Sequence, residues 1–117
     1  MVNIQSAELD NVFYALSDPT RRQILSLLNE GAHTITSLAQ PFKMSLAAVS
    51  KHIKVLEDAK LLNRKKLGRV HECTLNPAAL RTAEEALHYY TKFWNDQLDQ
   101  FADALESKST DLKPRRK

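Results

Sequence analysis

The sequence has one cysteine and two glycines among its 117 residues. The single thiol, Cys73, excludes an internal disulfide and any metal site built from several cysteines of one chain. The glycines, Gly31 and Gly68, lie too far apart for a GxGxxG or a GxxxxGK[ST] phosphate-binding loop. The sequence therefore excludes the common classes of nucleotide-dependent enzyme.

Long apolar runs are missing as well. No segment approaches the roughly 18 consecutive apolar residues of a membrane-spanning helix, and the N-terminal MVNIQSAELDNV lacks the basic-then-apolar order of a signal peptide. With 43% hydrophobic and 26% charged residues, the composition is typical of a soluble globular domain. We expect one domain that stays inside the cell and has no membrane partner.

Positive charge is concentrated in the middle of the chain. Residues 1–42 carry a net charge of −2 and residues 72–117 carry −1, whereas residues 43–71 carry +6. Clustered lysine and arginine favour a polyphosphate backbone, because binding releases its counterions. A solvated basic face is the alternative interpretation, and the organisation of this segment decides between them.

Apolar residues at helical spacing predict two helices in the first third of the chain. The first covers about residues 6–16. Asp18 is a candidate N-cap for the second helix, which begins at Pro19 because proline suits a first turn. Gly31 is expected to close this helix in a left-handed conformation.

A short helix and a longer one follow. Thr34 and Thr36 are competing N-caps for the short helix, which ends at Pro41, and Ser45 is expected to cap a helix over residues 46–59. The apolar stripe predicted to be the buried face of the longer helix is Leu46, Val49, Ile53 and Leu56.

The pattern then changes to that of a hairpin. Residues 63–66 and 70–75 flank a turn in which Gly68 supplies the positive φ. A final helix is expected over about residues 77–106, followed by a polar, disordered tail over residues 107–117. The fold class is therefore mainly α with a small β-hairpin: a winged helix-turn-helix domain over residues 1–106.

The helix over residues 46–59 suits entry into a major groove. Its outward N-terminal half carries small residues and then Lys51, so the backbone can approach DNA while serine, histidine and lysine reach bases or phosphates. The alternatives are an ordinary surface helix and a solubilising hairpin. The candidate DNA contacts are Ser45, Ala48, Ser50, Lys51, His52, Lys54, Arg64, Lys65, Lys66 and Arg69.

Three segments resemble the ArsR-type winged-helix repressors of bacteria: DPTRRQILSLL, TSLAQPFKMSLAAVSKHIKVLEDAKLL and GRVHECTLNPAAL. The family pattern matches Ser45, Val49-Ser50-Lys51-His52, Val55-Leu56 and Gly68-Arg69, and the resemblance covers about residues 7–106. It implies a homodimeric bacterial regulator of transcription, located in the cytoplasm at the nucleoid and usually a repressor released by a signal.

The chain departs from the metal-sensing members of that family. The helix around TSLAQPF has no cysteine or histidine, and His88 is alone on the last helix, so we expect no metal and no cofactor. The segment from Tyr90 to Asp99 is similar to a subgroup without known metal sites. A site between subunits, built from Cys73, His71 or His88, stays open, although half-buried packing is the better interpretation of Cys73.

Another departure is Lys60, which stands where the family usually has glycine. It is expected either to adopt a left-handed cap at some cost or to extend the helix.

The last helix is too long for its own core. Thirty residues span about 45 Å, whereas a domain of this size has a radius of gyration near 13 Å. The helix also holds five of the eight aromatic residues, for which a pocket for a hydrophobic ligand is an alternative to core and dimer packing. The residues predicted to form a dimer interface through the first and last helices are Leu9, Phe13, Leu87, Tyr90, Trp94, Leu98, Phe101 and Leu105.

These patterns predict a sequence-specific DNA-binding regulator, a repressor that acts as a homodimer on an inverted-repeat operator in double-stranded DNA. A small hydrophobic molecule or a protein is the expected inducer. The alternative function is a winged-helix module that binds protein without specific DNA binding. An enzyme is not expected, since no motif places a nucleophile–base or carboxylate pair.

Overall fold

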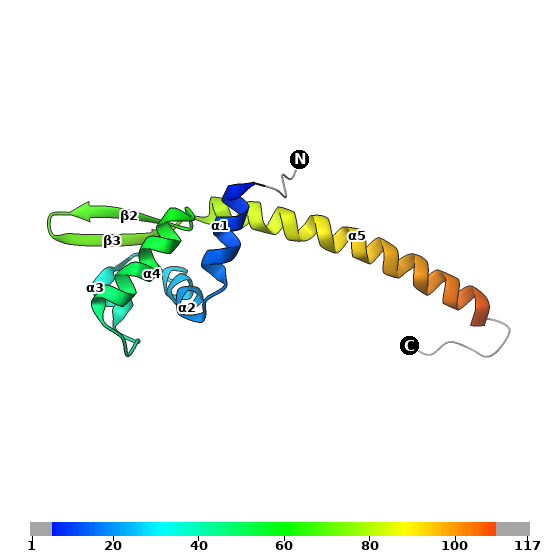
Figure 1. The fold of residues 1–117 in the computed structure, drawn as a ribbon, viewed down its shortest axis with the longest axis horizontal. Helices are drawn as coiled ribbons and strands as arrows, with labels where there is room; N and C mark the ends of the chain where they lie inside the picture. The colour runs from blue at the N-terminus through cyan, green and yellow to red at the C-terminus, as the bar shows by residue number, and fades with distance from the viewer. Residues whose placement is uncertain (1–5, 110–117) are drawn as a thin grey trace.

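The structure is a computed structural model, and it describes residues 6–109. In chain order its elements are α1 (Ala7–Leu16), α2 (Pro19–Leu28), β1 (His33–Thr34), α3 (Ile35–Ala39), α4 (Leu46–Asp58), β2 (Leu62–Leu67), β3 (Val70–Leu75) and α5 (Pro77–Ser109). This order confirms the mainly helical fold with a hairpin (Figure 1). α5 continues to Ser109, so the expected tail is helical at residues 107–109, and its remainder, residues 110–117, lies outside the described residues.

The predicted N-caps start three of the helices. Oδ2 of Asp18 accepts a hydrogen bond of 3.1 Å from the backbone N–H of Arg21, and Oγ of Ser45 accepts one of 3.1 Å from Ala48. Of the two candidates for α3, Thr34 is the cap, because its hydroxyl accepts from the N–H of Ser37 at 3.0 Å. Each cap satisfies a backbone donor that the first turn leaves without an intrahelical partner.

The ends of α2 and α4 differ in backbone conformation. Asn29, the C-cap of α2, is right-handed, and Gly31 has a φ of +139°, so the expected left-handed helical cap at Gly31 is wrong. Lys60 has a φ of +61°, and the first alternative predicted for it is correct. The N–H of Lys60 donates to the Glu57 carbonyl and that of Leu61 to the Leu56 carbonyl, both at 2.9 Å, which is the Schellman pattern.

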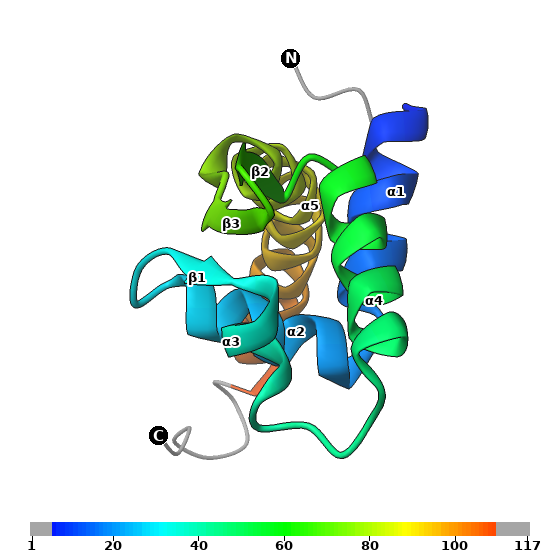
Figure 2. The same ribbon diagram turned by 90° about the vertical axis from the view of Figure 1, so that its left-hand side faces the viewer.

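The hairpin is part of a three-stranded antiparallel sheet in the order β1-β3-β2. Leu67 pairs with Val70 across a two-residue turn, in which Gly68 has the positive φ of +64° that the sequence predicted. The sequence did not predict β1, a strand of two residues in which His33 pairs with Cys73. Figure 2 shows β1 crossing beside β3, so the base of the hairpin is fixed to the chain that precedes α3.

The core lies between α1, α2, α4 and the base of the sheet. Val49, Ile53 and Leu56 of α4 are fully buried in it, as predicted. The prediction that Leu46 belongs to this buried stripe is wrong, because 52% of Leu46 is exposed. Leu46 is the first residue of α4, and the elements that bury this helix cover it only from its second turn onward.

α5 extends away from the rest of the chain. Its last residue in the core is Ala86, and the remainder projects beyond the other elements (Figure 1). The molecule measures 73 × 31 × 21 Å and its radius of gyration is 21.0 Å, against about 13 Å for a compact domain of this size. The half of α5 after Ala86 is therefore without a core in this chain.

Candidate nucleic-acid interface

One end of the molecule is formed by α3, the start of α4 and the hairpin of β2 and β3, opposite the projecting half of α5 (Figure 1). Between these elements lies a groove of about 410 Å³. It is lined by Thr34, Ile35, Thr36, Leu46, Ser50, Arg64, Arg69, Val70 and His71. We call this end the α4–hairpin face.

Most of the predicted DNA contacts are exposed here. Ser45, Lys51 and Lys54 are exposed on α4, and Lys65, Lys66 and Arg69 are exposed on the hairpin, whereas Ala48 and Ser50 are half-buried. Nζ of Lys54 donates to Oδ1 of Asp58 at 2.8 Å, and this hydrogen bond raises the pKa of Lys54. The face thus combines an outward helix start with cations on two elements, the charge distribution that suits a polyanion.

His52 is held from behind rather than free. Nη1 of Arg21 donates to Nδ1 of His52 at 3.2 Å, and Nδ1 also lies 3.9 Å from Oδ2 of Asp18. The Arg21 side chain donates in addition to the carbonyl oxygens of Ala15 at 2.9 Å and Tyr14 at 3.0 Å. Arg21 is the one charged residue of the buried set, so this cluster fixes how α4 sits on α1 and α2.

Arg64 is the predicted DNA contact with the least exposure on the hairpin. Its Nη2 lies 2.9 Å from Oε1 of Glu57 on α4, its Nη1 lies 3.4 Å from Nδ1 of His71, and 19% of its side chain is exposed. The buried Nε of Arg64 has no hydrogen-bond partner. Arg64 therefore ties β2 to α4, and the sequence gave no signal of this pairing because Glu57 lies on another element.

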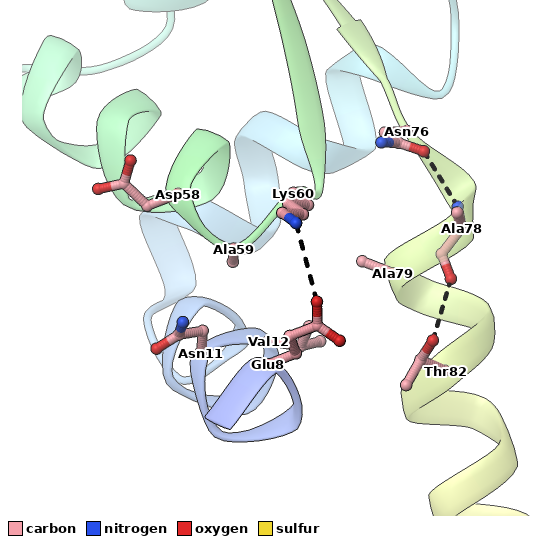
Figure 3. Close-up of a pocket in the computed structure, with 10 residues that line it drawn as sticks. All are labelled: Glu8, Asn11, Val12, Asp58, Ala59, Lys60, Asn76, Ala78, Ala79 and Thr82. Atoms are coloured by element: carbon pink, nitrogen blue, oxygen red, sulfur yellow. Dashed lines mark hydrogen bonds and ion pairs between the residues drawn. The ribbon is translucent and has the colours of Figure 1, made fainter. Parts of the chain in front are cut away.

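A second cavity, of about 240 Å³, opens between α1, the end of α4 and the start of α5 (Figure 3). Nζ of Lys60 reaches across its mouth to within 3.7 Å of Oε2 of Glu8. The side chains of Asn76 and Thr82 bond to the backbone of Ala78 at 3.2 and 3.4 Å. These polar groups serve the local structure of the wall.

Cys73 is fully buried, more so than the half-buried packing expected from the sequence. Burial raises the pKa of its thiol, which disfavours the reactive thiolate. Among residues 6–109, no group of three or more His, Cys, Asp and Glu side chains is placed to hold a metal ion. No helix within the same range is long and apolar enough to cross a membrane.

The predicted dimer residues divide into two groups. Leu9 is 4% exposed and belongs to the core of its own chain, so it is not available to a partner. The others are exposed: Phe13, Leu87, Tyr90, Trp94, Leu98, Phe101 and Leu105. Beside them, a groove of about 450 Å³ between α1 and α5 is lined in part by Phe13, Leu16, Leu80 and Leu87.

Comparison with known proteins places the chain among regulators of transcription. Residues 16–65 match the helix-turn-helix domain family. The chain is 33% identical to the transcriptional repressor SdpR of Bacillus subtilis over 74% of this chain and 93% of that protein. It is 32% identical to the HTH-type transcriptional regulator Rv2034 of Mycobacterium tuberculosis, over 87% of this chain and 92% of that protein. The crystal structure of an ArsR family transcriptional regulator is similar with a TM-score of 0.76 and 36% identity, covering 81% of this chain and 97% of the other.

Proposed function

The chain belongs to the ArsR family of winged helix-turn-helix regulators, which bind DNA and are not enzymes, and from this we propose that it is a homodimeric repressor acting on an inverted-repeat operator. The same proposal places it in the bacterial cytoplasm, at the nucleoid. A small hydrophobic molecule or a protein as inducer stays a prediction.

The dimer proposal rests on one observation, the apolar face of α5. Six residues recur at intervals of three and four along one side of this helix, and each is between 45% and 61% exposed. Monomeric proteins rarely expose so long a contiguous apolar surface. A second copy of the chain covers it with the same residues, as the symmetry of a dimer requires. We call this surface the α5 apolar face: Leu87, Tyr90, Trp94, Leu98, Phe101 and Leu105.

The groove between α1 and α5 extends this surface toward the core. Leu80 and Leu87 contribute to the groove from α5, and Phe13 and Leu16 contribute from α1. Phe13 is 37% exposed there, whereas Leu9 is buried, so the proposed interface includes Phe13 and omits Leu9. An apolar side chain from the partner's α5 would fill this groove.

On the DNA side, α4 enters the major groove with its N-terminal turn first. Ser45, Ser50 and Lys51 lie in the first two turns of α4, where recognition helices contact base edges. Lys65, Lys66 and Arg69 contact phosphates from the adjacent hairpin, because they are exposed beside the groove of the α4–hairpin face. Two copies related by a two-fold axis therefore require half-sites about 34–36 Å apart, or a multiple of that spacing.

His52 and Arg64 take supporting parts in this proposal. The contact of His52 with Arg21 orients α4, and the 2.9 Å pairing of Arg64 with Glu57 holds the hairpin against α4. Both side chains are partly exposed, so a direct DNA contact by either remains a prediction beside the supporting one.

The test combines selection of DNA with sedimentation. Purified protein is incubated with a pool of random duplexes, and the retained DNA is sequenced and returned to gel-shift titration. The expected result is one enriched inverted repeat, bound by a protein that sediments as a dimer at micromolar concentration and that represses a promoter overlapping the repeat. Retention of DNA without sequence preference would contradict the proposal and favour the protein-binding module, and a sedimenting monomer would contradict the dimer.

A further inference from the structure

Apolar side chains are exposed on the α4–hairpin face, where the surrounding surface is polar and basic. Leu46 is 52% exposed, Val70 is 48% exposed and Met44 is 37% exposed. Leu46 and Val70 line the groove from opposite sides, together with Ser50 and Arg69. The α5 apolar face lies at the other end of the molecule, so dimerisation through it leaves this apolar surface uncovered (Figure 1).

The position of Leu46 limits what can cover it. It is the first residue of α4, directly after the Ser45 cap. In a recognition helix this turn lies deepest in the major groove and meets base edges. The apolar group that DNA presents in the major groove is the 5-methyl group of thymine, which side chains read by apolar contact rather than by hydrogen bonding.

From this position we infer that Leu46 is a specificity-determining residue that packs against the 5-methyl group of a thymine in each half-site of the operator. The inference rests on the proposed function, since it assumes that the start of α4 enters the major groove. Ser50, one turn later on the same side of α4, and Arg69 at the hairpin turn supply polar contacts around the apolar one. The operator is therefore expected to contain a required thymine facing the start of α4.

Replacing thymine by deoxyuridine tests this contact, because the exchange removes the methyl group and leaves the base-pairing edge unchanged. In the operator obtained by selection, each thymine is replaced singly and then at both symmetric positions. At one position per half-site, binding of the unaltered protein should weaken about fourfold, the value of one buried methyl group, and about sixteenfold when both half-sites are changed. Other thymine positions should show little change.

Two variants connect the effect to the side chain. Leu46→Ala should bind the thymine and deoxyuridine operators equally, whereas Leu46→Met, which keeps an apolar side chain of similar volume, should retain most of the difference. Because Leu46 is half exposed at a helix start, both variants should fold, and circular dichroism and thermal unfolding check that they do. A deoxyuridine effect that is absent in the unaltered protein, or unchanged in Leu46→Ala, would overturn the inference while the selected operator still supports the proposed function. Failure to enrich any DNA would overturn both.

Discussion

Nη1 of Arg21 lies 3.2 Å from Nδ1 of His52, so a residue of α2 is bonded directly to the proposed recognition helix. The same guanidinium donates to carbonyl oxygens of Tyr14 and Ala15 at the end of α1 and lies 5.0 Å from the centre of the Tyr14 ring. Three helices therefore meet at one buried cation. Asp18, which caps α2 and faces His52 at 3.9 Å, completes the cluster and gives it a dependence on pH.

We predict that Asp18 stabilises the fold above about pH 4 and loses this effect in acid. Partial burial raises its pKa, but the N–H of Arg21 and the charges of His52 and Arg21 outweigh burial, so the pKa lies below its usual value. A carboxyl group whose pKa is lowered by folding stabilises the protein above its unfolded pKa, near 3.9, and the effect disappears as the pH falls through the folded pKa. Urea unfolding of the unaltered protein and of Asp18→Asn from pH 2 to pH 7 measures it.

The free-energy difference between these two proteins should be largest at neutral pH and should vanish in acid. Asn caps a helix about as well as Asp, so Asp18→Asn isolates the charge. Asp18→Ala, which also removes the cap, should cost about 1 kcal/mol more and should keep that part of the loss at every pH. A difference between the unaltered protein and Asp18→Asn that grows as the pH falls would contradict the assignment.

A second prediction concerns the left-handed residue at the end of α4. Lys60→Gly should raise the free energy of unfolding by about 1 kcal/mol, because a side chain with a Cβ is strained at a φ of +61°. Lys60→Ala is the matched control, since it removes the same exposed ion pair with Glu8 but keeps the Cβ. Chemical unfolding of all three proteins checks the prediction, and equal stability of the glycine and alanine variants would refute it.

The sequence predicted the features that depend on neighbouring residues. Caps such as Asp18 and Ser45 and the turn at Gly68 follow from local chemistry, which is why the order and approximate bounds of the helices and hairpin were correct. The strand at His33 and Thr34 was not predicted, because its pairing partners lie forty residues later and two residues carry no periodicity.

The errors at Leu46 and Leu9 have a related cause. Both residues lie on apolar stripes, but a stripe does not show where along a helix the neighbouring elements begin and end. α4 is uncovered at Leu46, whereas α1 is covered at Leu9 by the chain's own core. The pairing of Arg64 with Glu57 likewise joins two elements whose contact no local pattern reports.

For the α5 apolar face, we predict that Leu98→Glu converts the dimer to a monomer. Leu98 is 59% exposed in the single chain and lies in the middle of the proposed interface. A carboxylate buried there without a partner costs several kcal/mol, so the dissociation constant of the dimer should rise by about 100-fold or more. Sedimentation velocity measures the change, and operator binding should weaken with it.

Gln100→Glu is the control for this variant. It introduces the same charge two residues away, about 200° around the helix from Leu98, and should leave the dimer intact. If both variants dissociate, the added charge rather than its place on the apolar face is responsible. A dimer that survives Leu98→Glu would place the interface elsewhere.

Metal ions should not release the protein from DNA. Cys73 is fully buried with a raised pKa, which disfavours the thiolate that binds metals, and Nδ1 of His71 lies 3.4 Å from Arg64. Titrating Zn²⁺, Ni²⁺, Cd²⁺ and As(III) into the protein–DNA complex, with fluorescence anisotropy as the readout, tests this. Stoichiometric release by any of them would reveal a site between subunits involving Cys73, His71 or His88.

The last prediction separates reading of the sequence by α4 from positioning by the hairpin. Arg69 is exposed at the hairpin turn, so Arg69→Ala should weaken binding to all sequences alike and lower the salt dependence by about 0.9 for each lost phosphate contact, or about 1.8 per dimer. Lys51 is exposed on the second turn of α4, so Lys51→Ala should cost about 1–3 kcal/mol at its own base pair and relax the preference there. Both variants are titrated against a set of operator variants at two salt concentrations.

The two readouts distinguish the roles because phosphates are the same in every sequence and base edges are not. Lys66→Ala is a matched control for Arg69→Ala, since Lys66 is an exposed cation on the same hairpin, and it should change the salt dependence without changing base preference. If Arg69→Ala alters base preference while Lys51→Ala changes only the salt dependence, the roles are reversed: the hairpin reads bases, and α4 serves to hold the backbone.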